Sequence, residues 1–463
     1  MAPPVMVSTP SRSGVSVRPG FHVTPQSGWI NDPLGVTWHE GPTGGRYEMF
    51  VQYNPAAPEW SPACGWGQMS SPDLVRWEWV GVALTPGPDE VGCWSGAVVV
   101  DDDGAPSIFY TRVAGESLDV GSVVRARGDR DWSTWVVDPG EPVVAGPPDG
   151  LPFTQFRDPA VRRDGDGWSM VIGGGLTDGR GTALSWSSPD LSTWTFDGVL
   201  AERPTTETDP VWTGSVWECV QLFPLEDRWV LLLSVWHDGL AQYVACSVGD
   251  LHDGRFQPST WQRFTANDAL YATTSFLDDQ RRRSAVSWVR ESAAPGPAWA
   301  GALSLPVLLG LDGDRVTIDP HPDVDTLRSG LVADLGPTEV DVEPVVLGPF
   351  DPFLDIGIAT RAGAGGLRLT VLADGVEVLV LASGDGQRGL TVGRPGRPDE
   401  RLPDAGDHLR LLLDAGLAEV FSGGDTAAVR VDVAGPVALR VSAPGGAASL
   451  QGLTVHTMER FRA

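Results

Sequence analysis

The chain contains no lysine, so its 33 basic residues are all arginine, and they stand against 60 acidic residues. The formal net charge is −27 over 463 residues. A surface this acidic repels the phosphates of nucleic acids and the anionic head groups of lipids. We therefore expect neither nucleic acid nor a membrane among its partners. The sequence also lacks any run of about 18 apolar residues, the length that a membrane-spanning helix needs.

Cysteine is scarce as well, with four residues, at positions 64, 93, 219 and 246. They form no CxxC pair and no histidine cluster accompanies them, so a zinc site is not expected. Their wide spacing is not that of a disulfide framework. Residues 1–20 lack the apolar segment of a signal peptide. The sequence therefore predicts a cytoplasmic enzyme with free thiols, or a secreted one whose signal has been removed.

Tyrosine is rare, with five residues, whereas tryptophan is abundant, with nineteen. Indole faces stack on sugar rings in many all-β proteins, but core packing also uses tryptophan, so both interpretations stay open. Amphipathic helical periodicity is almost absent. What remains is a series of short, apolar, β-rich runs separated by turn residues.

Five of these runs recur at a nearly constant step. They begin at Tyr47, Ser107, Trp168, Trp229 and Ser284. The steps between these positions are 60, 61, 61 and 55 residues. In addition, SSPDLVRWEW at 70–79 recurs as SSPDLSTWTF at 187–196, close to two periods further on. Units of about 60 residues with several strands each are typical of a five-bladed β-propeller. A pair of β-sandwiches is the competing fold, but it does not explain the step.

The repeat ends near residue 310, and the pattern of apolar and polar residues then changes. Beyond residue 335, runs such as LRLTVLADGVEVLVLASG alternate apolar and polar residues and contain Asp-Gly turns, which is typical of an antiparallel β-sandwich. We thus expect an all-β protein with four segments. These are an N-terminal tail at 1–18, a catalytic five-bladed propeller at 19–310, a linker at 311–334 and a β-sandwich at 335–463.

A carboxylate stands shortly before three of the repeated runs. Asp32 lies in WINDPLG, Asp158 in FRDPA and Glu218 in WECVQL. Equivalent positions of successive propeller blades are related by rotation about the central axis, so these side chains should meet at one mouth of the channel. A single Asp before Pro is commonly only a turn former, but recurrence in phase with the blades favours a shared site. Arg157 should hold the adjacent Asp158 ionised.

Three carboxylates in a mouth rich in tryptophan suit glycoside hydrolysis. That reaction needs one acid at the anomeric carbon and another that protonates the leaving oxygen. Like charges close together raise one pKa, which supplies a protonated acid near neutral pH. Phosphoryl transfer would need basic clamps or a glycine-rich cradle, and metal-dependent hydrolysis would need clustered histidines. The sequence shows neither, so we expect no metal and no cofactor.

In this order and spacing, the three motifs resemble glycoside hydrolase family 32, the family of invertases, levanases and inulinases. QYNP at 52–55, LSLP at 303–306 and DAGLAEVF at 414–421 extend the resemblance over nearly the whole chain. It implies a five-bladed propeller followed by a β-sandwich. It also implies retaining hydrolysis of terminal β-D-fructofuranosides, such as sucrose or short fructans.

The resemblance further implies a role for each acid. Asp32 would be the nucleophile that forms a covalent fructosyl-enzyme, and Glu218 would act first as acid and then as base. Asp158 would bind fructose hydroxyls and stabilise the transition state. The partner would be a small fructoside, with no cofactor or metal, and the oligomeric state stays open. The residues expected at the substrate-binding site or its rim are Asn31, Gln52, Trp60, Trp94, Ser95, Arg157, Asp268, Tyr271 and Trp299, with Trp66 as a further candidate.

Several positions depart from the family pattern. Leu34 stands where the family usually has Asn, GWG at 65–67 replaces His-Trp-Gly, and Val220 stands where many members have Pro. The three carboxylates are intact, so we expect the catalytic chemistry to be retained. The changed positions leave the preferred substrate open. Three alternatives remain. They are fructosyl transfer to a sugar acceptor through the same intermediate, an inverting propeller enzyme acting on arabinan or xylan, and a non-catalytic sugar-binding propeller.

Overall fold

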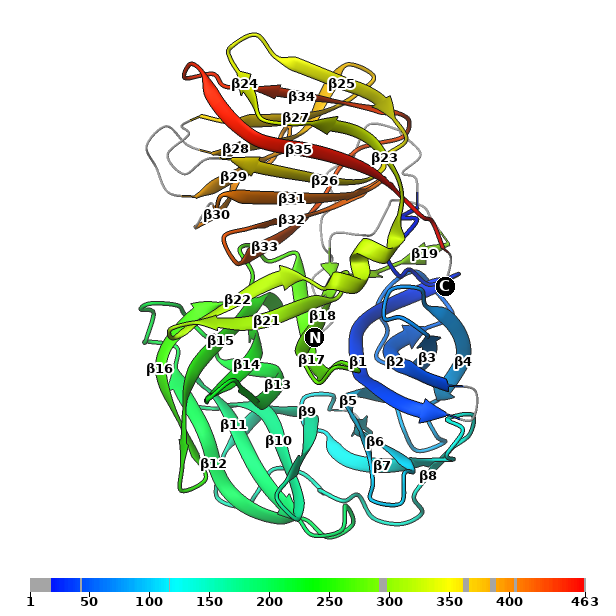
Figure 1. The fold of residues 1–463 in the computed structure, drawn as a ribbon. Coiled ribbons are helices and arrows are strands. Elements are labelled where there is room, and N and C mark those ends of the chain that lie inside the picture. The colour runs from blue at the N-terminus through cyan, green and yellow to red at the C-terminus, as the bar shows by residue number, and fades with distance from the viewer. Residues whose placement is uncertain are drawn as a thin grey trace.

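The computed structural model of the protein describes residues 18–41, 44–115, 117–290, 298–360, 366–383, 389–403 and 406–461. These residues form seven β-sheets. Five sheets surround a common axis as the blades of a propeller, and the other two pack face to face as a sandwich beside it (Figure 1). The all-β prediction of a five-bladed propeller followed by a β-sandwich is therefore confirmed. Among the described residues, no helix has the length and hydropathy to cross a membrane.

Each blade follows the order of the chain from its inner to its outer strand. The first blade contains β1 (Gly28–Gly41), β2 (Gly44–Asn54), β3 (Gly65–Ser71) and β4 (Glu78–Leu84), with β19 (Trp299–Ala300) parallel to β1. The second contains β5 (Gly92–Val100), β6 (Pro106–Val113), β7 (Ser122–Gly128) and β8 (Trp135–Val137). The third contains β9 (Phe153–Asp164), β10 (Gly167–Leu176), β11 (Arg180–Ser188) and β12 (Thr195–Pro204).

The last two blades are built in the same way. The fourth contains β13 (Val216–Leu225), β14 (Arg228–His237), β15 (Leu240–His252) and β16 (Arg255–Arg263). The fifth contains β17 (Leu270–Leu277), β18 (Arg283–Val289), β20 (Ala302–Leu303), β21 (Val307–Asp312) and β22 (Arg315–Pro320).

The fifth blade corrects the predicted linker at 311–334. β21 and β22 form a hairpin around Gly313 and Asp314, so residues 311–320 belong to the propeller. The polar Asp-Gly-Asp segment that suggested a linker is the turn of this hairpin, and Gly313 has a φ of 61° there. The connection between the domains is the 3₁₀-helix η2 (Pro322–Leu327), and β23 begins directly after it.

The sandwich consists of two antiparallel sheets. One contains β23 (Arg328–Leu335), β24 (Thr338–Val340), β26 (Phe353–Thr360), β31 (His408–Asp414), β32 (Leu417–Ser422), β33 (Asp425–Arg430) and β35 (Ala448–Met458). The other contains β25 (Val345–Phe350), β27 (Arg368–Ala373), β28 (Val376–Ser383), β29 (Leu390–Gly393), β30 (Glu400–Leu402) and β34 (Val437–Ser442). Their inner faces bury aliphatic side chains such as Leu354, Leu369 and Leu411.

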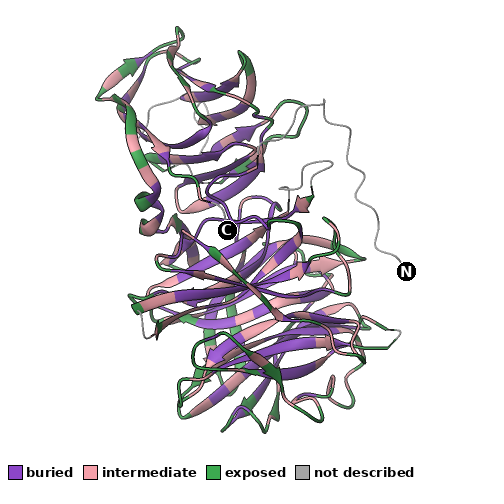
Figure 2. Cartoon of the chain, turned by 90° about the vertical axis from the view of Figure 1, so that its right-hand side faces the viewer, coloured by how far each residue is buried: buried purple, intermediate pink, exposed green. Residues whose placement is uncertain are grey.

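The blades pack through strands that are buried on both faces, as β14 illustrates. Its residues Val230–Val235 are all buried, without the alternation of a half-exposed strand. Val230 and Leu232 pack on the side of the fifth blade, whereas Leu231 and Leu233 pack on the side of the third. Figure 2 shows the same buried interior running through the stacked blades. This packing holds the inner strands, and hence the ends of the channel, in fixed positions.

The first described residues tie the propeller to the sandwich. The backbone N–H groups of Gly20, Phe21 and His22 donate to the Asp414 carboxylate, and the imidazole of His22 lies 2.8 Å from Asp414 and 3.1 Å from Glu419. Burial lowers the pKa of His22, but the hydrogen bonds to the two carboxylates outweigh burial and raise it to about 9. The imidazole is therefore charged at neutral pH and bridges the two domains.

Candidate active site

The innermost strands of the blades form a closed ring around the channel. β1 contacts β5, β5 contacts β9, β9 contacts β13, β13 contacts β17, and β17 returns to β1 (Figure 1). Asp32 lies on β1, Asp158 on β9 and Glu218 on β13. The blade repeat in the sequence predicted this convergence, and the structure places the three acids at the same end of the channel.

Every inner strand is interrupted by a β-bulge at the level of the acids. The register shifts fall between Ile30 and Pro33, Trp94 and Gly96, Arg157 and Ala160, Glu218 and Gln221, and Tyr271 and Thr274. Three of the bulges hold non-glycine residues in the left-handed region, namely Asp158 (φ 65°), Cys219 (φ 48°) and Ala272 (φ 48°). A bulge re-aims side chains that would otherwise alternate across the strand, so it turns the acids toward the channel mouth.

Two neighbouring side chains orient the carboxylate of Asp32. Ser95 donates its hydroxyl to Oδ2 at 2.5 Å, and Asn31 donates its amide Nδ2 to Oδ1 at 2.9 Å. Burial raises the pKa of Asp32 to about 6, the bond from Ser95 opposes that rise, and the charge of Glu218 adds to it. Asp32 is thus held in one orientation and becomes ionised only above about pH 6.

Asp158 sits deeper and in a strained backbone conformation. Its backbone N–H donates to Thr111 Oγ1 at 2.8 Å, and its Oδ2 accepts from the backbone N–H of Cys219 at 3.0 Å. Burial raises the pKa of Asp158 to about 7, the charge of Arg157 opposes the rise, and Glu218 and Asp32 add to it. The charge of Arg157 thus favours the ionised carboxylate of Asp158, as predicted, but burial and the two neighbouring carboxylates have the larger effect on its pKa.

Arg157 instead directs its guanidinium at Glu218. Its Nη2 and Nε lie 2.8 and 3.1 Å from Glu218 Oε1, whereas its nearest approach to Asp158 is 4.0 Å. Tyr271 donates its hydroxyl to the other oxygen, Oε2, at 2.6 Å. Burial and the charge of Glu218 raise the pKa of Tyr271 far above its usual value, so the phenol remains a donor. Glu218 is held from both sides.

The thiol of Cys219 lies between the acids. Its Sγ is 3.8 Å from Asp32 Oδ2 and 3.7 Å from Asp158 Oδ2. Burial and the surrounding carboxylates raise its pKa well above the usual value, so it stays a neutral thiol. Because Cys219 directly follows Glu218, these two residues of β13 supply one carboxylate of the site and contact the other two through the thiol.

Most of the predicted substrate-binding residues adjoin the acids. Gln52 accepts from Asn31 Nδ2 at 3.3 Å, and the Trp94 ring lies 5.9 Å from the guanidinium carbon of Arg157. Trp60, 40% exposed, packs edge-on against Trp94 at 5.9 Å, which leaves an indole face at the rim.

Three predicted residues make no direct contact with the acids among the described residues. Trp66 is fully buried and donates to the backbone of Trp94, so it supports the rim instead of lining it. Asp268 is exposed two residues before β17, ahead of the bulge rather than in it, and Trp299 packs under Arg18 at 4.4 Å where β19 pairs with β1. In the described part of the chain, no hydrogen bond, ion pair or ring contact links Asp268 or Trp299 to the three acids.

Two residues of the site escaped prediction. Gln155 accepts a hydrogen bond from Arg157 Nη1, and the ring of Trp236 lies 5.9 Å from the Arg157 guanidinium carbon. Gln155 precedes Arg157 by two residues, so the period of a β-strand would have placed both side chains on one face. Trp236 comes from the end of β14, a second strand of its blade, and no local motif marks it.

A cavity of about 700 Å³ runs along the propeller axis from the acids. All five inner strands line it, and Ser95, Asp158 and Cys219 stand at one end. Within the described ranges, no group of three or more His, Cys, Asp and Glu side chains is arranged to hold a metal ion.

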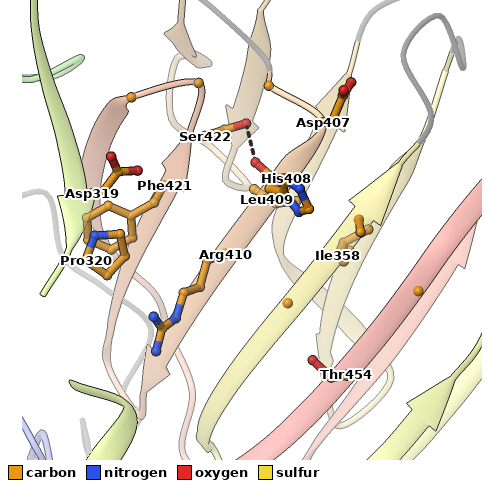
Figure 3. A pocket seen from close by; sticks show the side chains of 16 residues that line it. Asp319, Pro320, Ile358, Asp407, His408, Leu409, Arg410, Phe421, Ser422 and Thr454 are labelled. Carbon is orange, nitrogen blue, oxygen red and sulfur yellow. Dashed lines mark hydrogen bonds between the residues drawn. The ribbon is translucent and has the colours of Figure 1, made fainter. Parts of the chain in front are cut away.

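A second cavity, of about 580 Å³, lies where the sandwich meets β22 (Figure 3). Its two carboxylates, Asp319 and Asp407, stand on opposite sides, and Arg410 is engaged by Asp355 at 2.7 Å. Ser422 donates to the carbonyl of His408 at 3.0 Å, which closes part of the wall. It lacks the facing carboxylates of the channel mouth, so we assign the candidate active site to the propeller.

Comparison with known proteins agrees with this geometry. The profile described as "Glycosyl hydrolases family 32 N-terminal domain" matches residues 22–320. The sucrose-6-phosphate hydrolase of Escherichia coli is 31% identical over 344 residues, which cover 68% of this chain and 67% of that protein. The fructan 6-exohydrolase of Triticum aestivum is 31% identical over 374 residues, 70% of this chain and 60% of that protein.

A solved structure extends the likeness to both domains. A Bombyx mori β-fructofuranosidase, determined in complex with sucrose, superposes with a TM-score of 0.82 and 25% identity, over 96% of this chain and 94% of its own. The propeller, the sandwich, the three motif carboxylates and the profile match all lead to one assignment. The chain belongs to glycoside hydrolase family 32, a family of glycosidases.

Proposed function

We propose that this protein is a retaining β-fructofuranosidase that uses Asp32 as nucleophile and Glu218 as acid and base. One observation carries the proposal. Carboxylates from three different blades gather around the thiol of Cys219, which touches Asp32 at 3.8 Å and Asp158 at 3.7 Å and follows Glu218 in the chain. The charge of Glu218 also acts on Asp32. Retaining glycosidases need two nearby carboxylates, one to attack the sugar and one to protonate the leaving group.

In the first step, Asp32 attacks the anomeric carbon of a terminal fructofuranosyl unit. Glu218 gives its proton to the glycosidic oxygen as the carbon–oxygen bond breaks, and a fructosyl-enzyme ester remains on Asp32. The hydrogen bonds from Ser95 and Asn31 fix the attacking carboxylate, which supports its role as nucleophile.

In the second step, Glu218 removes a proton from water, and that water attacks the same carbon and frees Asp32. Arg157 and Tyr271 hold both oxygens of Glu218, which fixes the direction of proton transfer. Asp158 lies close to both acids, where its carboxylate can accept fructose hydroxyls and stabilise the positive charge that develops on the sugar ring.

We propose sucrose or a short fructan as the substrate. The E. coli relative is named for sucrose 6-phosphate, the Triticum relative for fructan, and the Bombyx mori structure contains sucrose. The common element of these names is a β-linked fructosyl group. The exposed indole of Trp60, packed against Trp94, supplies an aromatic surface on which a second sugar ring can stack.

The test measures release of fructose from sucrose, sucrose 6-phosphate, inulin and levan. We expect Asp32→Asn and Glu218→Gln each to lower kcat by about two to four orders of magnitude, while thermal unfolding stays cooperative. Asp149→Asn removes one exposed carboxylate elsewhere on the propeller and should leave kcat unchanged. Parent activity in either active-site variant would refute the assignment, and transfer products exceeding free fructose would replace hydrolysis by fructosyl transfer.

A further inference from the structure

The axial cavity has a second end, away from the acids, where arginines gather. Arg162 and Arg163 follow Asp158 on β9 by four and five residues, and Arg281 and Arg283 line the same cavity from the fifth blade. A strand advances about 3.3 Å per residue, so this end lies roughly 13–16 Å from the catalytic carboxylates. Since the chain has 60 acidic residues, we expect carboxylates to neutralise these arginines.

Two of these arginines are already neutralised. Arg162 pairs with Asp164 at 3.2 Å, and Arg163 pairs with Asp102 at 2.9 Å. Both therefore belong to the ion pairs of the propeller surface, and neither guanidinium offers a free charge to the cavity.

The carboxylates at this end are also engaged. Asp278 accepts from Arg282 at 2.6 Å and lies 3.1 Å from His321. Asp279 accepts from the hydroxyl of Tyr47 at 3.0 Å. Neither forms an ion pair with Arg281 or Arg283 among the described residues.

Arg283 differs from Arg162 and Arg163 because it has no ion pair within the described ranges. Its guanidinium carbon stacks at 4.8 Å over the ring of Phe223, and its Nε, like that of Arg162, is buried without a hydrogen-bond partner. Burial, and then the charge of Arg281, lower the pKa of Arg283 to about 10. Arg281 is exposed, and its side chain likewise has no hydrogen bond or ion pair among the described residues.

We propose that this end of the channel is a binding site for a small oxyanion such as phosphate, with Arg283 as the principal ligand and Arg281 as the second. A partly buried guanidinium without a counter-charge is costly, and an anion that accepts its hydrogen bonds removes that cost. The planar fork of arginine matches two oxygens of a tetrahedral oxyanion. The cavity of about 700 Å³ is large enough for such an ion with its water. This site does not depend on the function proposed above.

The experiment is a calorimetric titration of inorganic phosphate into the full chain at low ionic strength. We expect saturable binding of one phosphate, with a dissociation constant raised about tenfold or more by Arg283→Gln. Arg130→Gln removes an equally positive but exposed side chain from the turn before β8 and should leave the affinity unchanged. No saturable binding to the parent, or the same affinity in Arg283→Gln, would overturn the proposal.

A second variant keeps the test valid if Arg283→Gln does not fold. Arg281 is exposed, so Arg281→Gln should unfold at the parent temperature. We expect it to weaken phosphate binding about two- to fivefold. If Arg281→Gln and Arg130→Gln lost phosphate affinity equally, the affinity would depend only on net charge. That result would also overturn the proposed binding site.

Discussion

At the scale of single residues, the site is governed by competition between burial and hydrogen bonding. Asp32 accepts hydrogen bonds from Ser95 and Asn31, yet burial is the larger effect and raises its pKa to about 6. Since Asp32 is the proposed nucleophile and a nucleophile must be ionised, we expect activity to fall as pH drops through about 6, well above the ordinary titration range of an aspartate.

Replacement of Ser95 tests this balance. Ser95→Ala removes the bond that lowers the pKa of Asp32, so the acid limb of kcat/KM should move to higher pH by about one unit or more. The measurement is the pH profile of kcat/KM for sucrose between pH 4 and 9. Ser133→Ala removes an exposed hydroxyl far from the channel and should keep the parent profile. An unshifted limb in Ser95→Ala would contradict the proposed control of Asp32.

The sequence predicted which residues meet here better than it predicted how they interact. The motif positions of Asp32, Asp158 and Glu218 follow from the blade repeat, since rotation carries equivalent positions to one mouth. The partner of Arg157 did not follow, because adjacency in the chain suggested Asp158, whereas the bulge in β9 turns the guanidinium toward Glu218. Side-chain direction at a bulge cannot be read from strand alternation.

At the scale of elements, a glycine allows the close contact between the third and fourth blades. Gly173 on β10 pairs with Arg157, and a Cβ added there would lie 2.2 Å from the carbonyl oxygen of Trp217, the residue before Glu218. Only glycine allows so close an approach of two backbones. The distance between the strand that carries Asp158 and the strand that carries Glu218 therefore depends on this contact.

Gly173→Ala tests that dependence. The new methyl group must push β13 away from β10, so Glu218 should shift relative to Asp158 and kcat should fall about tenfold or more. The same displacement should lower Tm. Gly146→Ala adds a methyl group in open space and should alter neither quantity. Parent kcat in Gly173→Ala would show that the position of Glu218 does not depend on this contact.

The blades could be predicted from the sequence, whereas the bulges in their inner strands could not. The steps of about 60 residues revealed the blades, because each blade repeats the same apolar strand. The bulges were not foreseen, since Cys219 and Ala272 adopt positive φ although neither residue type favours it. Such conformations are imposed by the surrounding blades rather than by local preference.

At the scale of the whole molecule, a buried charge network joins the two domains. The imidazole of His22 lies between Asp414 and Glu419 on the sandwich, and all three side chains are buried. The backbone N–H of Leu305 also donates to Glu419 at 3.0 Å, which adds the last blade to the network. No motif in the sequence marks His22, because its partners lie almost 400 residues away.

Replacement of His22 should destabilise the whole chain. His22→Asn leaves two buried carboxylates without their cation, at a cost of about 3–5 kcal/mol. The folded pKa of about 9 exceeds the ordinary 6.5, so the stabilisation is complete below about pH 6.5 and is lost as pH rises through 9. Thermal unfolding from pH 6 to 10 should show a declining Tm in the parent and a lower, flatter profile in the variant.

His252→Asn replaces an exposed histidine and serves as the control, with the parent profile expected. A parent Tm that does not change between pH 7 and 9, or a His22→Asn profile identical to it, would contradict the bridging role of His22.

We propose that Asp32 carries the sugar during turnover, and trapping the fructosyl-enzyme on this residue tests the proposal. Glu218→Gln is mixed with a β-fructofuranoside whose leaving group departs without protonation, and the protein is quenched, digested and analysed by mass spectrometry. We expect the peptide containing Asp32 to gain the mass of one hexosyl residue, because water attack on the ester lacks its base. An adduct on another residue, or products of inverted configuration with no adduct on Asp32, would contradict it.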